Sequence, residues 1–135
     1  MDLTTTPTGD GGAAVTVHLT PQESEMLGDD AAALLALLAR GMWAAADLRR
    51  GTPRDEWWPV VMDTSRLISA LSGIRDAALR EADPTSMSHA DIARWCGESR
   101  TTIASRRQRG ALPPADPSDW EIWARTGDFP DQPTV

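Results

Sequence analysis

Arginine is concentrated in one short stretch in the second half of the chain. Residues 99–110 contain four arginines and no acidic side chain, together with serine, threonine and one glutamine. A guanidinium group donates paired hydrogen bonds to a phosphate or to guanine, and a glutamine amide pairs in the same way with adenine. Threonine and alanine can touch the methyl group of thymine. These residue types favour contact with double-stranded DNA.

Two short helices that meet at Gly97 are the elements expected to position these side chains. Ser88 is placed to cap the first helix, with Asp91 at its third position, and Ser99 is placed to cap the second. Gly97 lies at the turn, where a positive φ is needed that glycine adopts freely. The spacing therefore predicts a helix pair over residues 88–110.

Apolar side chains indicate how this helix pair is seated. Ile92 and Ile103 are expected to pack against the preceding helix, which includes Leu67. Ala93 is small at the position where the two helices cross, and Cys96 is expected to be a small buried thiol. The sequence thus predicts a three-helix unit that carries one arginine-rich surface.

The run Ser99-Arg-Thr-Thr-Ile, followed by Arg106-Arg-Gln-Arg-Gly110 and Leu-Pro-Pro, resembles the helix-turn-helix of small transcriptional regulators from high-GC bacteria and their phages. The resemblance covers about 22 residues, or about 45 with the preceding helix. It implies sequence-specific binding in the DNA major groove and transcriptional regulation. Glu98 and Arg106 depart from the pattern, because apolar residues are usual at both positions, and a carboxylate at Glu98 would repel phosphate.

The resemblance also implies roles for individual side chains. The outward face of the second helix would read bases, while its later arginines and the serine cap would hold phosphates. The alternatives are that the arginines form a solvated face, or that the pair is an ordinary amphipathic hairpin. The implied DNA-binding residues are Arg94, Ser99, Arg100, Thr101, Thr102, Ala104, Ser105, Arg107, Gln108 and Arg109.

Charge is distributed unevenly along the chain, whose formal net charge is −7. Residues 86–110 carry five arginines against Asp91 and Glu98, which gives +3, whereas the segments on both sides are net negative. Because the Debye length at physiological salt is about 8 Å, distant acidic residues do not cancel a local basic surface. The basic window coincides with the predicted helix pair.

The remaining patterns predict a mainly α fold, a helix-turn-helix bundle with a short N-terminal β-strand. Val15, Val17 and Leu19 alternate with polar residues as in a strand with one apolar face. A short amphipathic helix is expected over residues 118–125, with Trp120 and Trp123 on one face. The predicted organisation is a disordered tail (1–13), a strand and helix region (14–58), a helix-turn-helix domain (59–112) and a C-terminal extension containing proline and tryptophan (113–135).

The longest apolar run, residues 31–48, is predicted to be a helix that is apolar around most of its circumference. Such a helix is either the centre of the core or a dimerisation element. Arg40, Gly41 and Asp47 interrupt it, so we expect it to be too broken to span a bilayer. One cysteine and no leader-like segment predict a soluble, cytoplasmic protein.

Enzymatic function is not expected, because the sequence contains no phosphate loop, Gly-x-Ser-x-Gly or His-Glu-x-x-His motif. No cofactor is expected, and no metal site, since His18 has no second ligand at zinc spacing. The expected partners are double-stranded DNA and a second copy of the chain. The alternative function is a protein-interaction adaptor that binds through Trp57–Trp58 or Trp120–Trp123.

Overall fold

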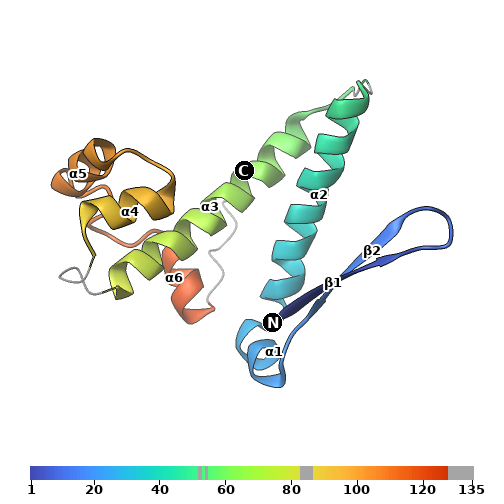
Figure 1. Cartoon of the computed structure of the whole chain (residues 1–135), viewed down its shortest axis with the longest axis horizontal. Helices are drawn as coiled ribbons and strands as arrows, with labels where there is room; N and C mark the ends of the chain where they lie inside the picture. Colours follow the sequence, from blue (N-terminus) through green and yellow to red (C-terminus); the bar gives the residue numbers. More distant parts are fainter. Residues whose placement is uncertain (52, 54, 83–86, 128–135) are drawn as a thin grey trace. The chain divides into compact units, whose positions relative to one another are not determined.

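A computed structural model describes residues 1–51, 53, 55–82 and 87–127 (Figure 1). The described chain is mainly helical, with one two-stranded antiparallel sheet, so the predicted fold class is confirmed at this level. The described residues pack as two units, residues 1–35 and the residues from Ala36 onward. The elements are β1 (Asp2–Pro7), β2 (Ala13–His18), α1 (Pro21–Leu27), α2 (Asp30–Arg50), α3 (Trp58–Glu81), α4 (His89–Cys96), α5 (Arg100–Gln108) and α6 (Asp119–Thr126).

The N-terminal unit contains a strand in the segment that was predicted to be disordered. β1 pairs with β2 in a register that places Leu3 opposite Val17, and Thr8 and Gly12 close the connecting loop through a 2.9 Å backbone hydrogen bond. The threonines of β1 favour extended backbone although they show no apolar alternation. The disorder prediction for residues 1–13 is therefore wrong. The sequence of β1 alone does not show the pairing with β2 on which this strand depends.

The apolar faces of the hairpin and of the following helices surround a hollow of about 540 Å³ within the N-terminal unit. Leu3 and Val17 contribute from the hairpin, and Leu27 and Leu34 from α1 and α2. A reciprocal capping box between Thr20 and Glu23 begins α1. The N-terminal ammonium lies 2.7 Å from the Glu23 carboxylate and, with the Thr20 backbone, lowers the pKa of Glu23 to about 2.

α2 is continuous, but the described chain does not enclose it. Only Leu37, Ala44 and Asp47 are buried on this helix of 21 residues. Whether α2 is a core helix or a dimerisation helix stays a prediction. By length and composition α2 is apolar enough to cross a membrane, so Arg40, Gly41 and Asp47 do not exclude a span as expected. Core helices of soluble proteins and signal sequences share this length and apolar character.

α6 packs closely along α3 (Figure 1). A Cβ atom placed on Gly73 would lie 2.4 Å from the carbonyl carbon of Trp120, so the two helix backbones meet at this glycine. Trp120 and Trp123 form an edge-to-face pair with ring centroids 5.5 Å apart, and Trp123 is buried. α6 is the short helix predicted for residues 118–125, and it is part of the packed unit rather than an appended extension.

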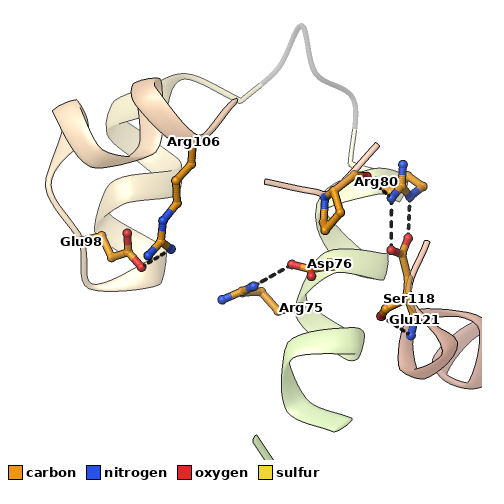
Figure 2. Close-up of polar contacts among 8 residues, drawn as sticks. Arg75, Asp76, Arg80, Glu98, Arg106, Ser118 and Glu121 are labelled. Carbon is orange, nitrogen blue, oxygen red and sulfur yellow. Dashed lines mark hydrogen bonds and ion pairs between the residues drawn. The ribbon is translucent and has the colours of Figure 1, made fainter. Parts of the chain in front are cut away.

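A buried ion pair joins the same two helices (Figure 2). Arg80 on α3 donates from Nε to Oε1 of Glu121 at 2.5 Å and from Nη2 to Oε2 at 3.1 Å. Arg80 Nη2 also donates to the carbonyl oxygen of Pro114 at 2.7 Å. Glu121 is fully buried, and the hydrogen bonds from Arg80 lower the pKa of its carboxyl. One guanidinium thus connects α3, the loop after α5 and α6.

The close approach at Gly73 predicts opposite effects for two glycine substitutions. Gly73→Ala should destabilise the protein by about 2 kcal/mol or more, because the new methyl group displaces backbone atoms of α6. Gly41→Ala is the matched control, since its Cβ would lie 3.9 Å from the Thr64 methyl group, an ordinary contact. It should stabilise α2 by about 0.5–1 kcal/mol. Urea unfolding measures both; equal effects would contradict the packing described.

The lowered pKa of Glu121 predicts acid sensitivity. Its ion pair contributes fully above the ordinary glutamate pKa of 4.5, and this contribution is lost as pH falls through the lower pKa of the folded state. Glu121→Gln should therefore lower the melting temperature at pH 7 by several degrees and reduce its fall between pH 5 and 3. Calorimetry across this range checks the prediction, and an unchanged acid dependence would contradict it.

Candidate nucleic-acid interface

α4 and α5 are joined by the tight turn predicted at Gly97. Gly97 has φ 67° and ψ 26°, in the left-handed region, and the following amide donates to the carbonyl of Ala93 at 2.9 Å. Ser88 and Asp91 form a reciprocal capping box at the start of α4. Ser99 accepts from the backbone N–H of Thr102 at 3.1 Å at the start of α5. The predicted caps and the predicted glycine conformation are confirmed.

A small apolar core lies beneath the two helices. Ile92, Ala93, Ile103 and Leu112 are buried together, and half-buried Leu79, Met87 and Cys96 pack against them. Leu79 comes from the last turns of α3, so one side chain of the preceding helix contacts this core. The buried Leu112 adds the start of the loop after α5 to the same core.

The structure divides the ten sequence-predicted site residues into two groups. The half-buried group consists of Ala104, Ser105 and Arg107. The exposed group consists of Arg94 on α4 together with Ser99, Arg100, Thr101, Thr102, Gln108 and Arg109. Arg94 lies 3.8 Å from Asp91 on its own helix. Arg109 donates from Nε to the carbonyl of Ser105 at 3.3 Å, so its side chain turns back along α5. The most accessible polar groups lie at the two ends of α5.

Glu98 and Arg106, the two departures from the helix-turn-helix pattern, contact each other (Figure 2). Arg106 Nη1 donates to Oε1 of Glu98 at 2.7 Å, and both side chains are partly buried. The other oxygen of Glu98 is buried without a hydrogen-bond partner among the described residues. An ion pair thus links the turn to α5 where two apolar side chains were expected. Opposite charges at two expected apolar positions were the signal that sequence reasoning missed.

This contact changes the electrostatics of the surface. Glu98 is neutralised by Arg106, so its carboxylate does not stand as a lone negative charge beside α5. The Arg106 guanidinium in turn is held by Glu98. Within the part of the chain that the structure describes, Arg100 and Arg107 have no acidic partner. The arrangement leaves guanidinium groups at the start and in the last turn of α5 that can bind an anion.

Comparisons of the chain with protein-family models, with curated proteins and with solved structures found no match.

The Glu98–Arg106 contact predicts a coupled response to substitution. Glu98→Leu and Arg106→Leu should each destabilise the unit, because each leaves a partly buried charge without its partner. The double variant places two apolar side chains in contact. Its free energy of unfolding should exceed the value expected from adding the two single effects by about 1 kcal/mol. A double-mutant cycle in urea measures the coupling, and a coupling energy near zero would show that the pair is incidental.

Proposed function

We propose that the protein binds double-stranded DNA through α4 and α5, acting as a helix-turn-helix with α5 in the major groove, and that it regulates transcription. The observation that carries the proposal is the surface of α5. Thr101 and Gln108 are exposed on the side opposite Ile103, which is fully buried in the core, and Arg100 is exposed in the first turn. A rigid helix with one anchored face and one hydrogen-bonding face suits groove reading.

Charge supports the same assignment. The window of residues 86–110 carries +3 in a chain of −7, and its acid nearest α5, Glu98, is paired with Arg106. The acidic remainder reduces non-specific attraction to DNA, so binding depends on local contacts. This favours selective over general DNA binding.

Exposure suggests how the side chains divide their roles. The N-terminal residues of a recognition helix contact base edges, which assigns base reading to Arg100, Thr101 and Thr102. Arg107 and Arg109, in and just after the last turn, and the Ser99 cap are assigned to phosphates. Ala104 and Ser105 are half-buried and therefore contribute less to base reading than the sequence alone indicated.

A protein-interaction adaptor is the second candidate, favoured by one observation. Trp95 on α4 is 66% exposed, and Trp58 at the start of α3 is 59% exposed. Exposed tryptophans are frequent anchors of protein interfaces. The other proposed anchor pair is Trp120 and Trp123, whose rings contact each other edge to face. Trp123 is buried and so is not available to a partner, which weakens this part of the alternative.

The proposal is tested with a duplex selected from a random pool by the full chain. Arg100→Ala should weaken binding to the selected duplex by about 5- to 150-fold and relax its sequence preference. Arg49→Ala, which removes the same charge from the exposed end of α2, should change affinity less than about twofold. Fluorescence anisotropy at fixed salt measures both variants.

A salt titration of the same duplex provides the second measurement. The logarithm of the association constant should fall linearly with the logarithm of salt concentration, by about 0.9 for each phosphate neutralised. Equal losses for the two arginine variants would contradict the assigned site. No binding to any duplex at about 50 mM salt would favour the adaptor.

A further inference from the structure

Two uncharged polar side chains, Thr101 and Gln108, lie on the face of α5 that points away from its anchor, Ile103. With 3.6 residues per turn, Thr101 lies about 160° from Ile103 around the helix axis, and Gln108 lies about 140° from it. A separation of seven residues is almost two full turns, so both side chains share one face, about 10.5 Å apart along the axis. Both are exposed, whereas Ile103 is fully buried.

The arginines near the end of α5 do not occupy this face. Arg106 and Arg107 lie within about 60° of Ile103 around the axis. Arg106 is held in its ion pair with the turn, and Arg107 is half-buried. Arg109, the residue after α5, turns back and donates to a backbone carbonyl of the helix at 3.3 Å. At its C-terminal end, therefore, α5 offers an amide rather than a guanidinium on the face away from the core.

Thr101 and Gln108 also keep their hydrogen-bonding groups available. The neighbouring Thr102 does not, because its hydroxyl lies 2.8 Å from the Ser99 hydroxyl in the cap of α5. Among the described residues, neither the Thr101 hydroxyl nor the Gln108 amide forms a hydrogen bond with another side chain. Exposed glutamines are common, so the informative property of Gln108 is its position on the same face as Thr101, two turns further along.

The side-chain amide of Gln108 has one acceptor and one donor side by side. In the major groove, adenine places its N6 amino donor beside its N7 acceptor, so an amide pairs with both groups at once. Guanine presents two acceptors, cytosine one donor, and thymine one acceptor beside a methyl group. Each of these three bases leaves one side of the amide unpaired. The amide therefore fits adenine better than any other base.

We propose that Gln108 is a specificity-determining residue that selects adenine, and that Thr101 contacts a second base pair about two to three base pairs away. This inference rests on the function proposed above, with α5 in the major groove. The separation follows from the distance of about 10.5 Å between the two positions along the helix and from a rise of about 3.4 Å for each base pair.

Selection from a random duplex pool by the full chain tests the role of Gln108. The wild type should enrich a sequence in which one A·T base pair becomes G·C when Gln108→Arg is used instead, because a guanidinium pairs with the two acceptors of guanine. Gln22→Arg is the matched control, since Gln22 is exposed on α1 and the variant makes the same change in charge outside α4 and α5. It should enrich the wild-type sequence.

The variant Thr101→Arg tests the spacing in the same selection. It should introduce guanine at a second position, about two to three base pairs from the position that Gln108→Arg changes. Guanine introduced by both variants at one position would overturn the arrangement, because the two side chains would then not read separate base pairs.

A second variant, Gln108→Ala, keeps the test decisive if Gln108→Arg does not fold, because alanine suits a helix. Selection with Gln108→Ala should lose the preference for adenine at one position. Fluorescence anisotropy then compares the enriched duplex with duplexes that carry guanine or 7-deazaadenine, which lacks the N7 acceptor, at this position. Guanine should weaken wild-type binding by about 5- to 150-fold, and 7-deazaadenine should weaken it as well. Neither should change the affinity of Gln108→Ala by more than about twofold.

The outcomes separate this inference from the proposed function. If the wild type enriches a duplex and the Gln108 variants keep its base preference, only the role of Gln108 is overturned. The same holds if these variants lose affinity equally for every sequence, because Gln108 would then contact the DNA backbone or act on the fold. A wild type that enriches no duplex overturns both the inference and the proposed function.

Discussion

The placement of the candidate site depends on one contact, the Arg80 guanidinium held between Glu121 and the Pro114 carbonyl. It fixes α6 on α3, and it also holds the loop that follows α5. Two residues before Pro114, Leu112 is buried in the core beneath α4 and α5. The same guanidinium therefore restrains both the last helix and the exit from the arginine-bearing helix. A buried carboxylate tolerates this position only because the arginine satisfies both of its oxygens.

Pairing of buried or partly buried charges recurs in the helical unit. Arg80 with Glu121, and Arg106 with Glu98, occupy contacts that apolar side chains would make in an ordinary small helical core. Each pair specifies which elements meet, because a charge left without its partner costs more than a mismatched apolar contact. The second pair also has an electrostatic consequence, since it removes the negative charge of Glu98 from the surface on which α5 presents its arginines.

The sequence predicted the parts of the structure that local chemistry determines. Serine caps at 88 and 99, the left-handed Gly97, and buried Ile92 and Ile103 all follow from short-range rules and are confirmed. The parts it did not predict depend on distant partners. β1 needs β2, Glu98 needs Arg106 eight residues away, and the packing of α6 on α3 needs the gap that Gly73 leaves. The apolar pattern of α2 predicted a helix but left its burial open, because periodicity alone does not distinguish a core helix from one that a second molecule covers.

Amide chemical-shift mapping by NMR can examine whether α5 is the DNA-reading surface that we propose. A selected duplex is titrated into the isotopically labelled full chain at low salt. We expect the largest shifts on residues 99–109 and on Arg94, while the amides of α6 and of the β1–β2 hairpin change little. Shifts that avoid α5, or that are centred on Trp58 and the α2 helix, would contradict it.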